Sequence, residues 1–392
     1  MLPDGDNPRC PSLAPLLHPP RRKYLFGGIG VFILILGVML AVYLITSSGN
    51  DESFVLDRTP LFAGRNNLAQ NLENLVKDDL TLVNLNSDLT NDTIFGYTNC
   101  SHCNTDFLRL KKGQVGSQFW VARSGCDNST RVSNAITQLD VINRMIKNYS
   151  DYLQLVRSSN DLEDAYENKK LGSLMFVDGG QSIMNSTAFL RFFYDFGVRA
   201  MTLGSGCNDS ILMNYIEENN NLTDFGKLCI GEMNRLGMMI DIQGLSTPVQ
   251  EQILNISRAP VLISNTAAFM INNYPGNVDD GTLNLLKNNS GLLMITFDAP
   301  SLANGDNVTI SDVVKHLNHI SETIGFDNIA IGGNYDSIYK KPQDLENVSD
   351  FPKLFKELKN LKNSNWTADN LDKLAGLNFK RFFKDVEKAR TQ

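Results

Sequence analysis

The chain has 392 residues, of which 42% are hydrophobic and 20% are charged, and its formal net charge is −7 at pH 7. This length allows one large domain with a sizeable core, such as a barrel of about 250 residues or more. The acidic balance lacks the positive footprint of a nucleic-acid-binding protein, so we exclude nucleic acid as a partner.

The first element predicted in chain order is a membrane span at residues 24–46. It reads YLFGGIGVFILILGVMLAVYLIT and contains no charge. About 20 apolar residues cross a bilayer core, and a cleaved signal peptide has a shorter apolar stretch, so we predict an uncleaved signal-anchor helix. Residues 21–23 (RRK) precede it and residues 51–52 (DE) follow it. The positive-inside rule therefore predicts a single-pass plasma-membrane protein with a cytoplasmic N-terminus and an extracellular C-terminal domain.

The span divides the chain into four parts. Residues 1–23 contain six prolines and are predicted to form a disordered cytoplasmic tail. Residues 47–58 are predicted as an extracellular stalk, and residues 59–392 as one ectodomain without an internal linker.

Acceptors for N-glycosylation support this orientation, because every N-x-S/T motif lies on the predicted outer side. The motif places candidate glycans at Asn91, Asn99, Asn128, Asn148, Asn185, Asn208, Asn221, Asn255, Asn288, Asn307, Asn347 and Asn365.

Cysteine usage also fits an oxidising compartment. Five of the six cysteines lie outside, namely Cys100, Cys103, Cys126, Cys207 and Cys229. An odd number leaves at least one thiol free or paired with another chain. The run Cys100-Ser101-His102-Cys103 has the residue types of a metal clip, but outside the cell a disulfide is the favoured interpretation.

Short apolar runs alternate with helical patterns through the ectodomain. Apolar residues at helical spacing occur within 132–146 and 313–320, and strand-like runs occupy 171–177, 199–203, 238–242, 260–264, 291–297 and 328–331. This alternation predicts a parallel α/β fold of about eight units, and therefore a (β/α)₈ barrel. Barrel chemistry lies on the loops after each strand. Those loops are expected at 64–67, 178–181, 204–206, 243–245, 265–267 and 333–336.

These loops carry a family resemblance. The stretches LKKGQVGSQFWVA (110–122), VDGGQSIMNSTAFLRFFYDFGVRAMTL (177–203), APVLISNTAA (259–268) and ISDVVKHLNHISETIGFDNIAIGGNYDSI (310–338) resemble successive segments of the zinc-dependent membrane (renal-type) dipeptidases. The resemblance runs in the same order through most of the ectodomain. It implies an amidohydrolase-type barrel that, in active members, holds two zinc ions and hydrolyses dipeptides.

The chain departs from the family at the positions that carry the chemistry. The zinc-binding His and Asp after the first strand correspond to Arg65 and Asn67, and two further zinc-binding histidines correspond to Gly244 and Asn265. The metal-bridging Glu corresponds to Asp178. The remaining correspondences are the substrate-facing His with Ser205, the substrate-carboxylate Arg with Gly276, and the proton-handling Asp with Asn334.

These replacements predict that the chain binds no metal and needs no cofactor. A two-zinc site requires several imidazole and carboxylate ligands, and only Asp178 remains a strong one. We therefore expect no catalytic and no metal-binding residues, and the chain is interpreted as a pseudoenzyme.

The scaffold is expected to be kept. Cys126 and Cys207 correspond to an intrachain disulfide of the family. The C-terminus lacks the apolar tail of a lipid-anchor signal, so we expect the residue 24–46 span to hold the protein in the bilayer.

Three functions compete on this sequence. The first is an accessory subunit or surface recognition protein, with a membrane-protein partner or a second copy of the chain. The second is a receptor that binds a small ligand or peptide in the former active-site pocket. The third is a hydrolase of altered chemistry around Asp178 and Asp336.

Overall fold

The computed structural model describes residues 55–204, 207, 212–214, 220–362 and 364–390. The predicted cytoplasmic tail, the predicted span and Ser205 lie outside the described residues. In these ranges no helix combines the length and apolarity needed to cross a bilayer. Residues 55–58, predicted as the end of the stalk, form helix α2 (Val55–Arg58), whose Val55 and Leu56 are buried.

Eight parallel strands form a closed barrel. They run in the spatial order β2-β1-β11-β10-β9-β8-β5-β4, and β2 pairs again with β4 to close the ring. The strands are β1 (Leu61–Asn66), β2 (Val115–Arg123), β4 (Leu171–Asp178), β5 (Val198–Thr202), β8 (Met239–Asp241), β9 (Val261–Thr266), β10 (Leu292–Thr296) and β11 (Ile329–Gly333). The predicted (β/α)₈ fold is confirmed.

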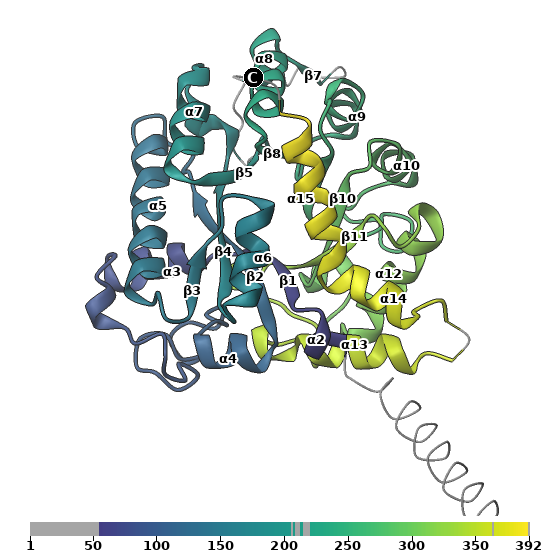
Figure 1. Cartoon of the computed structure of the whole chain (residues 1–392). Coiled ribbons are helices and arrows are strands. Elements are labelled where there is room, and N and C mark those ends of the chain that lie inside the picture. The colour runs from purple at the N-terminus through teal and green to yellow at the C-terminus, as the bar shows by residue number, and fades with distance from the viewer. Residues whose placement is uncertain (1–54, 205–206, 208–211, 215–219, 363, 391–392) are drawn as a thin grey trace, which may run out of the picture. The chain divides into compact units, whose positions relative to one another are not determined.

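Helices surround the barrel, as Figure 1 shows. Those that follow the eight strands are α3 (Leu68–Val76), α5 (Arg131–Asn148), α7 (Thr187–Phe196), α8 (Asp224–Leu236), α9 (Thr247–Ile256), α10 (Asp280–Asn288), α12 (Ile310–Ile324) and α13 (Phe351–Asn360). Additional elements decorate this plan: α4 (Phe107–Lys112), α6 (Ser159–Glu167), α11 (Ala299–Leu302), α14 (Ala368–Asp372), α15 (Asn378–Lys388), η1 (Leu80–Leu82), β3 (Leu153–Leu155) and the hairpin of β6 (Met213–Asn214) and β7 (Asn221–Leu222).

The predicted elements agree with the structure to within two residues wherever a continuous apolar run marked a strand. The helical patterns at 132–146 and 313–320 lie in α5 and α12. Four predicted loops are wrong in part. Residues 64–66 belong to β1, residue 178 to β4, residues 265–266 to β9 and residue 333 to β11, because these strands continue through polar residues or glycine at their C-terminal ends.

The barrel interior is apolar toward the N-terminal ends of the strands, and α15 covers that end. Phe62, Phe119, Leu174 and Phe176 belong to one buried cluster together with aromatic residues of α15. From α15, Phe379 stacks on Phe62 and meets Phe119 edge-on. An amphipathic helix with Phe at positions i, i+3 and i+4 presents one apolar face, and here that face closes the barrel.

Two disulfides differ in what they connect. Cys126–Cys207 joins the segment after β2 to the segment after β5, with a sequence separation of 81 residues. Cys100–Cys103 spans only 3 residues, and Cys229 is a buried free thiol. The structure thus contains the disulfide that the resemblance implied, and it resolves the pairing that the sequence left open.

The candidate glycan acceptors lie on the surface. Eleven of the twelve are described, and all of these except the half-buried Asn347 are exposed. The remaining acceptor, Asn208, lies outside the described residues. A glycan needs an exposed acceptor, so the fold is compatible with the predicted pattern.

The two disulfides should contribute unequally to stability. In the chain-entropy model the long loop closed by Cys126–Cys207 is worth about 4.5 kcal/mol, and the short Cys100–Cys103 loop about 2 kcal/mol. We expect Cys126→Ser/Cys207→Ser to lower the melting temperature and cell-surface amount markedly. The matched control, Cys100→Ser/Cys103→Ser, should lower both by less. Equal losses in thermal unfolding and surface labelling would contradict this ranking.

Candidate functional site

A ring of polar side chains follows the apolar interior at the C-terminal mouth of the barrel. On three adjacent strands the side chains that face the barrel interior change from apolar to polar toward the C-terminal end. Phe176 is followed by Asp178, Ala200 by Thr202, and Met239 by Asp241. Asp178 pairs in register with Thr202, and Thr202 with Asp241. Since side chains alternate along a strand, these residues share the inner face, so the strands bring them together.

An ion pair between Arg65 and Asp178 spans this mouth. Arg65 Nη2 donates a hydrogen bond to Asp178 Oδ2, and the guanidinium carbon of Arg65 lies 5.3 Å from the centre of the Phe176 ring. The Arg65 side chain is 9% exposed and that of Asp178 is 17% exposed. Each charge is largely removed from water, and each is the other's counter-charge.

A second carboxyl group, Asp241, lies deeper in the same layer. Its Oδ2 accepts hydrogen bonds from Thr202 Oγ1 and Ser264 Oγ, both at 2.7 Å, and its Oδ1 accepts one from the Ser264 amide at 2.9 Å. Burial raises the pKa of Asp241, while the charge of Arg65 acts to lower it. Arg65 therefore influences two carboxyl groups, although it contacts only one.

The predicted positions Gly244, Asn265 and Gly276 lie on the opposite side of the ring, where β8 and β9 end. Gly244 has φ +76°, in the left-handed region that favours glycine, and a Cβ added there would meet nothing within 4 Å. Asn265 lies within β9, and the carbonyl of Gly276 accepts a hydrogen bond of 2.9 Å from Thr266 Oγ1. The residues after β9 thus reach the mouth through backbone contacts.

Asn67 and Asn334 directly follow β1 and β11, where backbone hydrogen bonds join the ends of these two strands. The Asn67 amide donates to the Tyr335 carbonyl at 3.2 Å, next to Asn334 in the chain. Asn334 is buried and has φ +64°, a left-handed conformation that Asn tolerates better than most residues. Ser205 lies outside the described residues.

Several amide oxygens around the mouth are buried without a partner. The side-chain oxygens of Asn67, Asn265, Asn334 and Gln243 have no hydrogen-bond partner among the described residues, and neither does Arg65 Nε. Buried acceptors are normally satisfied by protein, water or ligand. The mouth is therefore rich in acceptors that can take hydrogen bonds from a bound molecule.

A polar cavity of about 360 Å³ opens beside the ion pair. Asp178, Arg123 and Glu73 line it, together with the Cys126–Cys207 disulfide. Gln138 spans its wall, accepting from the Arg123 amide at 2.8 Å and donating to Glu73 Oε2 at 2.6 Å. The cavity gives Asp178 access to solvent.

Sequence reasoning missed Asp241 and the cavity residues. Asp241 left a signal, because it is a lone carboxylate inside the apolar run MMIDI, and a buried charge usually has a partner or a function. Arg123 and Glu73 left none, since they come from separate elements, β2 and α3.

Solved structures with the same fold include a metallopeptidase and an amidohydrolase. A metallopeptidase from Rhodobacter sphaeroides, solved with a phosphinate mimic of the dipeptide L-Ala-D-Ala, matches 84% of this chain and 99% of its own with a TM-score of 0.73 at 16% identity. An amidohydrolase from Pseudomonas aeruginosa matches 85% of this chain and 98% of its own with a TM-score of 0.67 at 19% identity. The fold is therefore an amidohydrolase-type (β/α)₈ barrel.

The sequence comparison gives the family. The pattern of the family described as membrane dipeptidase, peptidase family M19, matches residues 50–392. The chain is 37% identical over 342 residues to Dipeptidase 3 of Homo sapiens and to Dipeptidase 3 of Macaca fascicularis, covering 85% of this chain and 66% of each relative. The chain thus spans just under two thirds of the length of these relatives. It belongs to the membrane dipeptidase family.

The Arg65–Asp178 pair should behave as a coupled unit. Removing one partner of a buried pair costs about 3–5 kcal/mol, and the partial exposure of Asp178 places this pair at or below the lower end. We expect Arg65→Met to destabilise the fold by about 2–3 kcal/mol. Asp178→Leu should cost less, because the Arg65 charge remains near Asp241. Denaturant unfolding measures both.

The double variant Arg65→Met/Asp178→Leu is the decisive control. It removes both charges of the pair but also takes the Arg65 charge away from Asp241, so its loss of stability should be no greater than that of Arg65→Met and clearly smaller than the sum of the two single losses. A double variant that loses the sum of the two single losses would show that the two side chains are not coupled.

Proposed function

We propose that this chain is a catalytically inactive member of the membrane dipeptidase family that works as a non-enzymatic binding subunit at the cell surface. The observation that supports this most directly is the Arg65–Asp178 ion pair. Asp178 is the one strong metal ligand that the family resemblance leaves in place, and its charge is already matched by a guanidinium.

The residues at the mouth do not fit the two zinc ions that the family resemblance implies. A Zn²⁺ bound to Asp178 would lie close to Arg65, and at about 4 Å with an effective dielectric of about 20 the repulsion is roughly 8 kcal/mol. Asn67 and Asn265 offer neutral amides in place of the charged or imidazole ligands that zinc prefers. Gly244 offers no side chain, and its positive φ disfavours any other residue there.

The mouth also lacks a group suited to proton transfer at the family position. Asn334 carries an amide where the resemblance implies an Asp, and an amide cannot accept and return a proton as a carboxylate does. Loss of a positioned acid–base group costs about 10²–10⁴-fold in rate. Both carboxylate oxygens of the buried Asp336 are already engaged, because Thr105 Oγ1 donates to one and Asn71 Nδ2 to the other.

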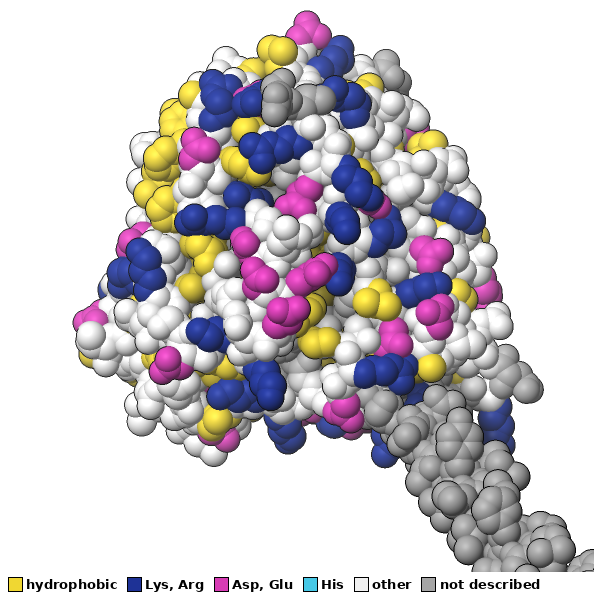
Figure 2. Space-filling model, viewed as in Figure 1, with side chains coloured by type: hydrophobic (Ala, Val, Ile, Leu, Met, Phe, Trp, Pro, Cys, Tyr) yellow, Lys and Arg dark blue, Asp and Glu magenta, His cyan; other side chains and the backbone are white. Residues whose placement is uncertain are grey.

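Exposed apolar side chains offer a surface for a partner. Phe192 on α7 is 50% exposed and Leu228 on the adjacent α8 is 64% exposed. Figure 2 shows hydrophobic side chains gathered along the edge that carries α7, while basic and acidic side chains are intermixed elsewhere on the face shown. Aromatic and aliphatic anchors of this kind carry much of the binding energy of interfaces. The proposed occupant is a membrane-protein partner or a second copy of the chain.

The span predicted at residues 24–46 would anchor the barrel at the plasma membrane. The exposed positions of the described glycan acceptors support an extracellular barrel. In this arrangement the scaffold faces outward, and the interaction with a partner would occur beside or outside the bilayer.

A receptor is the second candidate, and the unpartnered amide oxygens favour it. Asn67, Asn265 and Asn334 present acceptors around one mouth. Their ligand would be a small molecule or peptide that donates several N–H or O–H hydrogen bonds. The cavity beside Asp178 is lined by other residues than these asparagines, and its volume of about 360 Å³ gives further room for a ligand of this kind.

Zinc content tests the loss of the catalytic metal. We expect the full chain, purified without chelator or reductant, to contain far less than one zinc per chain by elemental analysis. It should show no dipeptide hydrolysis with added Zn²⁺. An active dipeptidase of the family serves as the positive control. Stoichiometric zinc that disappears in Asp178→Ala would overturn the proposal, and Cys100→Ser/Cys103→Ser excludes metal held elsewhere.

Co-purification from the membrane separates the subunit from the receptor. Asp178→Ala and Asn334→Ala should leave surface delivery and partner association nearly intact. Phe192→Asp/Leu228→Asp should reduce association by about tenfold or more, as loss of interface anchors does. Leu82→Asp, at another exposed leucine, is the matched control. The receptor replaces the subunit if the mouth variants abolish binding and the α7–α8 variant does not.

A further inference from the structure

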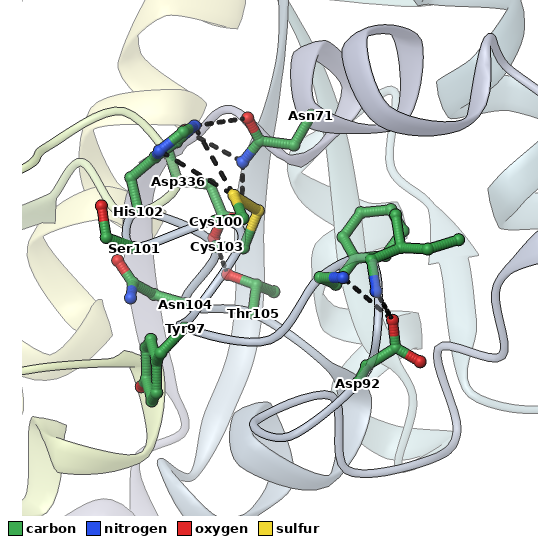
Figure 3. Close-up of a disulfide and its surroundings, with 12 residues drawn as sticks. Asn71, Asp92, Tyr97, Cys100, Ser101, His102, Cys103, Asn104, Thr105 and Asp336 are labelled. Atoms are coloured by element: carbon green, nitrogen blue, oxygen red, sulfur yellow. Dashed lines mark hydrogen bonds between the residues drawn. A yellow bond between two sulfur atoms is a disulfide. The ribbon is translucent and has the colours of Figure 1, made fainter.

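A short cysteine loop lies apart from the barrel mouth residues described above. Cys100 and Cys103 are 2% and 3% exposed, and His102 between them is half-buried (Figure 3). In the part of the chain that the structure describes, Cys100, His102 and Cys103 are the one group of three His, Cys, Asp or Glu residues whose ligand atoms all lie within 4.8 Å of one another.

The imidazole is already placed at a ligand's distance from sulfur. His102 Nδ1 lies 3.8 Å and Nε2 lies 3.7 Å from Cys100 Sγ. A tetrahedral Zn²⁺, with bonds of about 2.3 Å to sulfur and about 2.1 Å to nitrogen, separates such donors by about 3.6 Å. Both ring nitrogens therefore lie at about this separation from Cys100 Sγ, and reduction of the disulfide would let the two sulfurs move apart around the cation.

A buried hydrogen-bond chain fixes which histidine nitrogen is free. Asn71 Nδ2 donates to Asp336 Oδ1 at 3.0 Å, so Asn71 Oδ1 points toward His102 Nε2, 3.1 Å away. An amide oxygen only accepts, so Nε2 carries the proton and Nδ1 keeps its lone pair. Metal-binding histidines are oriented in this way by a hydrogen bond from the other ring nitrogen.

Two further contacts support the loop. The Tyr339 ring packs against His102 with centroids 4.7 Å apart, and Lys341 Nζ donates to the Ser101 carbonyl at 3.0 Å. Because Ser101 is exposed and His102 is half-buried, solvent can reach the site and supply a fourth ligand.

We propose that Cys100, His102 and Cys103 form a redox-gated site for a thiolate-preferring cation of the Zn²⁺ class, closed by the disulfide and opened by its reduction. The proposal does not rest on the proposed function, because none of the three ligands is one of the positions at which the family resemblance places zinc or catalytic groups; only the supporting Asn71–Asp336 hydrogen bond links the loop to the barrel mouth.

The gating step is a thiol–disulfide exchange with an external dithiol. The dithiol gives two electrons and two protons to the Cys100–Cys103 bond and becomes a disulfide itself. Zn²⁺ then forms two Zn–S bonds and one Zn–N bond, and the two thiol protons pass to solvent. Cys229 does not take part, since burial raises the pKa of its thiol to about 12.

Cobalt titration tests the site in the full chain in detergent, on a Cys10→Ser background. The protein is stripped with a chelator and reduced by a phosphine, which is then removed without air. Added Co²⁺ should give the thiolate-to-cobalt absorption band with one Co²⁺ per chain, and Zn²⁺ should displace it. The unreduced protein should show no band.

Variants separate this site from other thiols. Cys103→Ser should abolish the band, His102→Ala should weaken binding by 100-fold or more, and Asn71→Ala by about 10–100-fold. Cys126→Ser/Cys207→Ser should keep it. No band after reduction, or a band that survives both Cys103→Ser and His102→Ala, would overturn the proposal. Because His102 is half-buried, we expect His102→Ala to fold. Cobalt binding by this variant therefore tests the proposal even if Cys103→Ser fails to fold.

Discussion

The Arg65–Asp178 ion pair is the constraint around which the barrel mouth is organised. Removing a carboxylate from water is costly unless a counter-charge replaces the lost solvation. In this fold three neighbouring strands place Asp178, Thr202 and Asp241 in one inward-facing layer, so an unbalanced negative charge would be the default. Arg65 balances it from β1. The protein keeps a polar layer at the mouth, and a side chain of the chain itself supplies the positive charge.

The residues that build the fold are therefore different from the residues at the positions where the family resemblance places zinc ligands. The apolar interior and the Cys126–Cys207 disulfide are built from other residues than the charged pair at the mouth. Gly64, next to Arg65 in the chain, is an example, because the close packing of β1 against β11 leaves no space for a side chain at this position. A Cβ there would come within 2.7 Å of Gly332 Cα on β11. Substitutions at Arg65, Asn67 and Asn334 change what the mouth can bind while the strands beneath them stay closely packed.

The sequence predicted the strands that are continuous apolar runs, such as β4 and β10, because a strand buried on both faces reads as such a run. The runs did not include β1 and β2, which mix Gly, Arg, Asn, Ser and Gln with apolar residues. Each candidate position could be matched to a position of the family, but the sequence did not show which of these residues contact one another. Arg65 meets Asp178 only because β2 pairs with both β1 and β4 when the ring closes. That pairing is a property of the closed barrel, so no local pattern records it.

The position of α15 has a consequence for how the protein is made. Phe379 packs on Phe62, so the last helix of the barrel covers a strand that is synthesised first. The pairing of β1 with β11 likewise joins the two ends of the barrel. A chain that emerges at about 5–20 residues per second must wait for its final helix before the interior is shielded from water. During that interval the phenylalanines of β1 and β2 are not yet packed against α15. The growing chain therefore exposes apolar surface to which chaperones and other nascent chains can bind.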